Sequence, residues 1–315
     1  MPTSMKVSKV RALCAALVGT SLVASCASAT GHEGATPQVV TVPPRAGAEI
    51  YVYAPWEQQL TSYDPQAGEV VATSSGEDFF YYAFGTPSPL YTAGSSSALG
   101  FAVLEVGRTS VRTVATVGSD EAVFPLATDG VRSFFVVYSY SRPGVESGRR
   151  IVRLEGDGSW QTYASFAGPS ELVDKGVLIG DQLFYSVYDP AKDVHTVFSL
   201  PADDPGAAPT LERGGLGSGE LYAFGGHLLV SDGTTIVGGP RDYRCASLCW
   251  FYDDPAVLAQ ITTEGADLVL SVSDAATGEE LGRAPSVVGF SFESGTLVAY
   301  TRHGVQDIDL TKEGA

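Results

Sequence analysis

Two cysteines four positions apart, Cys245 and Cys249, are the residues whose type and spacing most directly predict chemistry. They lie in the stretch RDYRCASLCWFYDDP. In an oxidising compartment a pair this close can form a disulfide, which would stiffen the short turn between the two cysteines. A zinc ion needs four ligands, and the sequence offers no second cysteine pair or neighbouring histidine. We therefore expect a structural disulfide, with free thiols and a metal or redox pair as the alternatives.

The same stretch places Trp250, Tyr252 and Asp253 directly after the second cysteine. Aromatic rings beside carboxylates can stack on a sugar or hold a peptide. The plainer interpretation is a strand whose rings enter the core, followed by an Asp-Asp-Pro turn, and we favour it. If this loop binds a ligand or a partner, these three residues are the ones that we expect to make the contact.

No stretch of the chain carries a known catalytic signature. The four histidines are dispersed, and the sequence holds no GxSxG, HExxH or phosphate-binding loop. Acidic pairs such as Asp203-Asp204 and Glu279-Glu280 stand in expected turns, where a solvated surface is the simpler explanation. We accordingly predict no catalytic residue, no metal ligand and no cofactor. The residues are more typical of a binding protein than of an enzyme.

A further cysteine, Cys26, closes a segment that is typical of export. Lys6, Lys9 and Arg11 precede an apolar run over 12–23. A membrane-spanning helix needs about 20 apolar residues, so this run is too short to span a bilayer and indicates a secretory signal. A buried amphipathic helix is the alternative interpretation.

The four residues that end at Cys26, VASC, resemble the lipobox of bacterial lipoproteins. The resemblance implies cleavage just before Cys26, a diacylglycerol group on its sulfur, and a mature chain that starts there. Residues 1–25 are then a signal peptide, and acyl chains hold the protein in a lipid bilayer. This predicts an exported protein, anchored on the outer face of the cell membrane or in the outer membrane.

The chain as a whole is strongly acidic, with 36 acidic against 19 basic residues and a net charge of −17. Such a surface repels phosphate backbones, which argues against nucleic acid as a partner. Residues 26–48 are small, polar and punctuated by proline. They predict a flexible tether between the lipidated cysteine and a folded domain over 49–315.

Short apolar runs rich in Val, Tyr, Phe and Leu recur through that domain. Several are almost continuously apolar, which suits strands buried on both faces, and no long segment shows the period of a helix. Many follow a turn that contains glycine. The pattern predicts an all-β fold, with runs that begin at positions 50, 100, 133, 182, 227, 267 and 296.

Two hairpins match each other closely, YDPQAGEVVA over 63–72 and SDAATGEELG over 273–282. Their offset of 210 residues is five times about 42, and the seven runs also place them five units apart. A repeating four-stranded unit of about 40 residues is typical of a β-propeller. We expect seven blades, with six blades and a two-sheet sandwich as the alternatives. We also expect the first unit to lack its inner strand, and N-terminal residues to complete the last blade and close the ring.

The D-x-x-x-G-E hairpins and the order IYVYA…LTSYDPQAGEVVA resemble blades of quinoprotein-type and surface-layer-type propellers. The resemblance implies the fold and no functional residue. With the lipobox it predicts an anchored binding or scaffold module for a protein or glycan partner. The alternative is an enzyme on the same scaffold, either a carbohydrate-active hydrolase or lyase or a quinone-dependent dehydrogenase. An enzyme would gather carboxylates, or histidine and arginine, with shifted pKa values, whereas a scaffold would expose an aromatic patch.

Overall fold

Every regular element in the described part of the chain is a β-strand, which confirms the all-β prediction. The computed structural model describes residues 50–54, 59–64, 69–73, 82–84, 90–96, 100–106, 111–142, 145–167, 171–231, 235–245, 248–253, 255–293 and 295–310. The predicted signal peptide, Cys26 and the predicted tether lie outside these ranges and stay predictions. Within the same ranges no helix has the length and hydropathy needed to cross a membrane.

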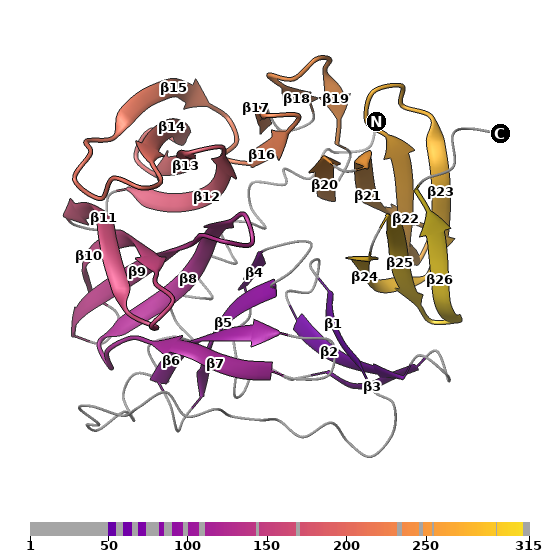
Figure 1. Ribbon diagram of the computed structural model, residues 1–315, viewed down its shortest axis with the longest axis horizontal. Helices are drawn as coiled ribbons and strands as arrows, with labels where there is room; N and C mark the ends of the chain where they lie inside the picture. The colour runs from indigo at the N-terminus through magenta and orange to yellow at the C-terminus, as the bar shows by residue number, and fades with distance from the viewer. Residues whose placement is uncertain are drawn as a thin grey trace, which may run out of the picture.

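The described strands pair into seven antiparallel sheets that follow one another along the chain (Figure 1). The first sheet holds β1 (Ile50–Ala54), β2 (Gln59–Asp64) and β3 (Glu69–Thr73). The second holds β4 (Tyr82–Phe84), β5 (Leu90–Ser96), β6 (Gly100–Val106) and β7 (Val111–Thr116). The third holds β8 (Glu121–Thr128), β9 (Ser133–Arg142), β10 (Val145–Leu154) and β11 (Trp160–Ala167). The fourth holds β12 (Leu172–Ile179), β13 (Gln182–Asp189), β14 (Val194–Pro201) and β15 (Thr210–Leu216).

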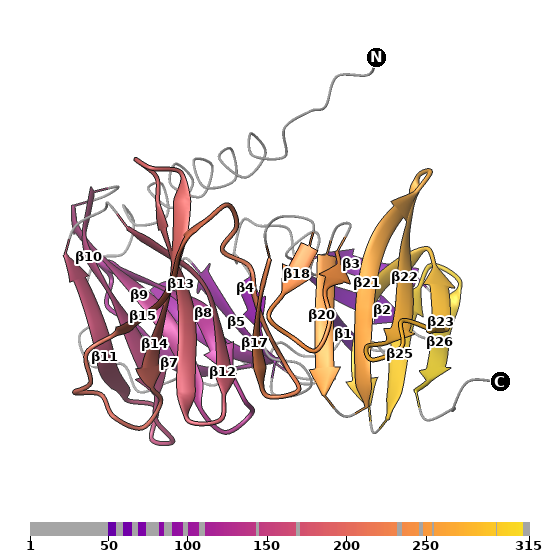
Figure 2. The same ribbon diagram turned by 90° about the horizontal axis from the view of Figure 1, so that it is seen from above.

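The remaining three sheets complete the chain in the same order. The fifth holds β16 (Leu221–Phe224), β17 (His227–Ser231), β18 (Thr235–Val237) and β19 (Tyr243–Arg244). The sixth holds β20 (Leu248–Asp253), β21 (Ala256–Glu264), β22 (Asp267–Asp274) and β23 (Glu280–Pro285). The seventh holds β24 (Val287–Glu293), β25 (Thr296–Thr301) and β26 (Gly304–Asp309). The sheets stand side by side around a common centre (Figure 1), and Figure 2 shows the same sheets from above. This arrangement is consistent with a β-propeller.

Buried apolar side chains fill the spaces between neighbouring sheets. Phe134, Leu183 and Tyr185 belong to a cluster between the third and fourth sheets, and Ile261 and Leu297 belong to one between the sixth and seventh. Similar clusters join the second sheet to the third, the fourth to the fifth and the fifth to the sixth. A sheet that packs between two neighbours is covered on both faces. Its strands can therefore be almost continuously apolar, as the sequence predicts.

The seven apolar runs of the sequence each fall in a different sheet, but not at the same place in it. The runs at 133, 182, 227 and 296 form the second strand of their sheets, those at 100 and 267 form the third strand, and the run at 50 forms β1. The two matching hairpins are β2–β3 and β22–β23, which are the last two strands of the first and sixth sheets. Apolar content therefore identifies the sheets, while the rank of a strand within its sheet depends on pairing.

The first and last sheets meet through the edge strands β1 and β24. β1 takes the inner position of the first sheet, so the expectation that this strand is missing was wrong. Tyr63 on β2 is fully buried, packs edge-on against Tyr300 with ring centroids 5.5 Å apart, and donates a hydrogen bond of 2.8 Å to the carbonyl of Thr301. The described part of the last sheet contains only its own three strands. The expected closing strand from the N-terminus lies outside the described residues.

We predict that Tyr63→Phe lowers the free energy of unfolding by about 1 kcal/mol, because the Thr301 carbonyl loses a buried donor. Tyr63→Ala should cost about 3–5 kcal/mol through loss of the ring between the two sheets. The matched control is Tyr188→Phe, which removes an exposed 2.8 Å bond to Asp193 and should change stability little. Urea unfolding of the three variants measures the differences. Equal effects of the two Tyr→Phe changes would show that this contact does not hold the first and last sheets together.

The structure joins Cys245 and Cys249 in a disulfide. Cys245 directly follows β19 and Cys249 lies on β20, so the bond ties the outer end of the fifth sheet to the inner strand of the sixth. Both cysteines are buried in a cluster with Phe224 and Tyr243. The fifth sheet has short strands, and β18 pairs with β19 at only two positions. The disulfide therefore reinforces the part of the ring with the fewest ladder contacts among the described sheets.

Replacing both cysteines of this pair with serine should lower the free energy of unfolding by about 2 kcal/mol, the value expected for so short a closed loop. Guanidinium unfolding with and without dithiothreitol measures the effect. Reductant should destabilise the parent chain and leave the double variant unchanged. A parent chain that is insensitive to reductant, although its thiols are shown to be free after treatment, would contradict the prediction.

Candidate functional site

The three residues proposed from the sequence as a partner contact lie at the junctions between sheets. Trp250 packs edge-on against Phe290, with ring centroids 5.0 Å apart, and Tyr252 is buried against Phe292. Asp253 is exposed at the end of β20, where its carboxylate accepts a 2.7 Å hydrogen bond from the backbone amide of Gly225. This placement matches the plainer interpretation of the pattern. The candidate site lies on the third sheet and is built from other residues.

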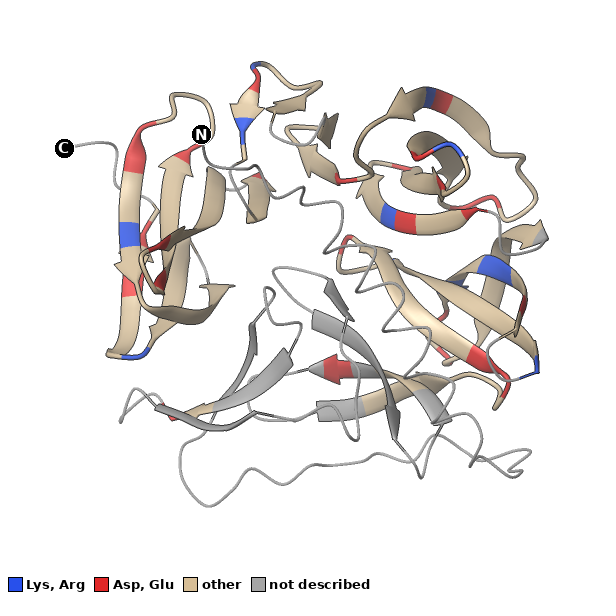
Figure 3. Ribbon diagram, turned by 180° about the vertical axis from the view of Figure 1, so that it is seen from behind, with Lys and Arg blue, Asp and Glu red and all other residues tan. Residues whose placement is uncertain are grey.

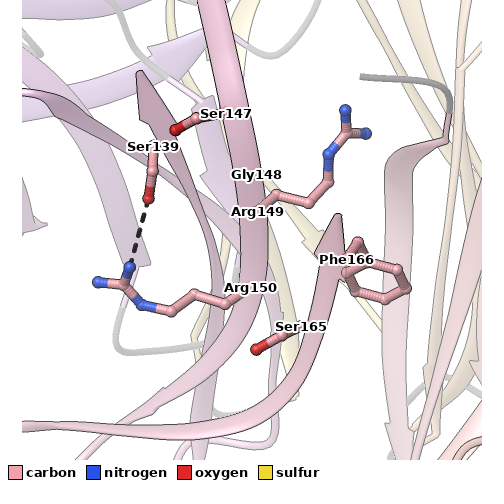
Figure 4. A pocket seen from close by; sticks show the side chains of 7 residues that line it. All are labelled: Ser139, Ser147, Gly148, Arg149, Arg150, Ser165 and Phe166. Carbon is pink, nitrogen blue, oxygen red and sulfur yellow. Dashed lines mark hydrogen bonds between the residues drawn. The ribbon is translucent and has the colours of Figure 1, made fainter. Parts of the chain in front are cut away.

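An open depression of about 420 Å³ lies over the outer strands of the third sheet. Sequence reasoning did not find it, because its residues come from three strands and include no motif. Figure 4 shows Ser139, Arg150 and Ser165 on one side of the β10 ribbon, and Arg149 and Phe166 turned to the other side. The described residues that line the depression are Ser139, Ser147, Gly148, Arg149, Arg150, Ser165 and Phe166.

Strand register brings these residues together. Arg150 on β10 stands directly opposite Ser165 on β11, and Ser139 on β9 stands opposite Gly148. The ladder between β9 and β10 is irregular on both sides of Glu146, and bulges of this kind redirect side chains. Ser147, which lies within the irregularity, is exposed. Serine hydroxyl groups from the three neighbouring strands β9, β10 and β11 consequently lie on one surface.

An ion pair forms the charged part of the depression. Arg150 Nη1 donates a 2.6 Å hydrogen bond to Glu121 Oε1 and lies 3.5 Å from Ser139 Oγ. Burial would raise the pKa of the Glu121 carboxyl, but hydrogen bonds from Arg150 and from the Gly118 amide outweigh burial, so the pKa lies below its ordinary value. Glu121 is therefore ionised at neutral pH, and Arg150 and Glu121 together carry no net charge.

A second arginine lies on the opposite face of β10. The side chain of Arg149 is fully buried, lies 5.1 Å from the centre of the Tyr138 ring, and donates a 2.8 Å hydrogen bond from Nε to Glu146. Its Nη1 has no hydrogen-bond partner in the structure as described. Burial raises the pKa of the Glu146 carboxyl despite the positive charge of Arg149, and burial likewise raises the pKa of the Tyr138 hydroxyl.

A histidine and a carboxylate extend this polar region into the fourth sheet. His195 Nδ1 lies 3.7 Å from Asp174 Oδ2, and the centre of the His195 ring lies 4.7 Å from that of Tyr188, with the two rings tilted by 30°. Both side chains lie over Gly219, where an added Cβ would come within 2.7 Å of the Asp174 oxygen. The glycine is therefore required by the close approach of these side chains. In the described ranges no group of three His, Cys, Asp or Glu side chains is arranged to hold a metal ion.

No protein-family model and no curated protein sequence matches the chain. Among solved structures, it is similar to a putative 6-phosphogluconolactonase from Bacteroides uniformis, with 14% identity over 84% of this chain and 96% of that chain and a TM-score of 0.44. It is also similar to a chain of a nidogen/laminin complex, with 11% identity over 83% and 98% of the two chains and a TM-score of 0.42. A Hadza microbial sialidase matches with 14% identity over 73% and 65% and a TM-score of 0.43.

The buried Arg149–Glu146 pair gives a prediction about stability. Glu146→Gln should lower the free energy of unfolding by about 3 kcal/mol, because it leaves a buried guanidinium without a carboxylate. Arg149→Met should cost less, since an apolar side chain of similar length suits the buried site and Glu146 retains access to water. Urea unfolding of both single variants and the double variant tests this asymmetry. The prediction would be contradicted if Arg149→Met lowered the free energy of unfolding strongly while Glu146→Gln left it unchanged.

Proposed function

We propose that the chain is an exported lipoprotein, anchored through Cys26, whose seven-bladed β-propeller acts as a binding module for a partner outside the cytosol. The seven antiparallel sheets support seven blades over six. The lipobox-like string VASC and the basic, apolar segment before it support the anchor. Residues 1–25 are the signal peptide in this proposal, and the bilayer is either the outer face of the cell membrane or the outer membrane.

The observation that carries the binding function is the open depression on the third sheet. Its hydroxyl groups and its arginine project from paired strands, so their positions are set before a ligand arrives. A preformed set of hydrogen-bonding groups reduces the entropy that binding must overcome. The depression exposes hydroxyl donors and acceptors together with the Arg150–Glu121 pair, a set of groups that suits recognition of a polar ligand.

A hydrolase or lyase is the second candidate function. Glu146, whose pKa is raised by burial, lies in the same polar region as Arg149, and the Asp174–His195 pair is nearby. Convergent carboxylates, histidine and arginine with a shifted pKa are typical of active sites as well as of structural ion-pair networks. A binding module releases its ligand unchanged, whereas a hydrolase or lyase cleaves it.

The test of binding uses the purified full chain in detergent, incubated separately with soluble glycans and with proteins from a bacterial cell envelope. Saturable binding with recovery of intact ligand supports the binding module. Release of new reducing ends or unsaturated sugars would favour the hydrolase or lyase if Glu146→Gln abolishes it under conditions in which that variant is still folded. Cleavage without accumulation of a complex would overturn the binding proposal.

We predict that Cys26→Ser moves the protein from the membrane fraction to the soluble fraction, because the acyl chains provide its attachment. Mass spectrometry of the N-terminal peptide should show diacylglycerol on Cys26 of the parent chain. Cys14→Ser, within the predicted signal peptide, is the matched control and should leave the protein in the membrane fraction. An unmodified Cys26 in a native membrane extract would refute the anchor.

A further inference from the structure

We propose that the depression formed by Ser139, Ser147, Arg150 and Ser165 binds a neutral, hydroxyl-rich ligand, namely an oligosaccharide chain lying across β9, β10 and β11. This inference rests on the proposed binding function and names its ligand class. The depression measures about 420 Å³, within the usual size of small-ligand sites, and it is open along the surface. An open site of this kind suits a chain that continues beyond it in both directions.

The hydrogen-bonding groups match those of a sugar. The hydroxyl groups of Ser147 and Ser165 can each both donate and accept, as can each hydroxyl group of a carbohydrate, while the Ser139 hydroxyl donates to Glu121 Oε1 at 3.4 Å. Ser139, Ser147 and Ser165 lie on three successive strands, and neighbouring strands are about 4.8 Å apart. The site therefore offers hydroxyl groups on three successive strands, staggered along the strand direction because Ser139 lies opposite Gly148 and Ser165 lies opposite Arg150. Ser147 and Ser165 are exposed and accessible to a ligand.

The charge of the site argues for a neutral ligand. Arg150 is paired with Glu121 at 2.6 Å, and the lowered pKa of Glu121 keeps that carboxylate ionised. An approaching carboxylate or sulfate would meet the Glu121 charge together with that of the guanidinium. The chain carries a net charge of −17, and its basic residues are scattered among acidic ones (Figure 3). Electrostatic attraction of an anion is therefore weak, whereas the Arg150–Glu121 pair can donate to and accept from neutral hydroxyl groups.

The shape of the site argues against a folded protein as the ligand. Protein interfaces depend on aromatic or apolar anchors that fill pockets at the centre of the contact. The ring of Phe166 is turned to the other face of β10 from the serines (Figure 4). On the serine side, the described lining consists of hydroxyl groups, a guanidinium group and backbone, and Arg149 and Phe166 complete the lining from the other side. A sugar needs no deep apolar anchor when its hydroxyl groups are paired.

The experiment uses the purified full chain and measures affinity by isothermal titration calorimetry. The neutral probes are the hexasaccharides of cellulose, chitin and starch, and the anionic probes are an oligogalacturonate and a sulfated oligosaccharide. We expect at least one neutral probe to bind, with an affinity that changes little between low and high salt. Preference for the anionic probes, strengthened at low salt, would overturn the ligand class.

Ser165→Tyr should reduce the affinity for that neutral probe at least fivefold by filling the depression, and Ser147→Tyr should do the same from the neighbouring strand. Thr162→Tyr is the control, because Thr162 is exposed on the same strand outside the lining. Unchanged affinity in both serine variants, with a normal unfolding midpoint, would overturn the site. Binding of an envelope protein without any of the sugars would overturn this inference and leave the proposed binding function standing.

Discussion

The structure depends on the burial of both faces of its sheets against their neighbours. An isolated four-stranded sheet with two apolar faces would expose at least one of them to water, so each sheet requires a neighbour on each side. Clusters of buried side chains occupy the described junctions from the second sheet through to the seventh. The same requirement applies to the last junction, where Tyr63, Val298 and Tyr300 form a smaller cluster between the seventh sheet and the first. A linear array would leave that surface exposed, and closing the ring removes it.

Polar groups reinforce this packing at the end of the third sheet that is remote from the depression. Arg132, in the turn after β8, donates to the carbonyl of Gly180 at 2.6 Å and to Asp203 at 3.2 Å. Arg153 donates to the carbonyl of Ala202 and to the same aspartate, both at 3.0 Å. These bonds connect the third sheet to two turns of the fourth. Exposed ion pairs contribute little to stability, whereas the bonds to two backbone carbonyls hold turns of the fourth sheet against the third sheet. The strands that carry the depression are thus held from the opposite end.

The architecture could be predicted from the sequence better than the site could. Apolar runs and glycine turns were enough to indicate seven strand-rich units, because a strand that is buried on both faces carries apolar residues at nearly every position. Trp250 and Tyr252 were ambiguous, since an aromatic residue suits either a core or a binding surface until its neighbours, Phe290 and Phe292, are known. The depression was not predictable. Its serines have no distinctive spacing, and the register of β9, β10 and β11, with an irregularity at Glu146, is what brings them together.

The two arginines of β10 show how adjacent positions on one strand can serve different purposes. Side chains alternate between the faces of a strand, so Arg149 enters the junction with the fourth sheet while Arg150 reaches the open depression. Each is paired with a glutamate, but burial dominates for Glu146 and hydrogen bonding dominates for Glu121, so their pKa values move in opposite directions. Arg149 is therefore tied to the stability of the ring, and Arg150 remains available at the surface. A ligand that contacts Arg150 meets a group whose position is fixed by Glu121 and by the ladder, and whose charge is already balanced.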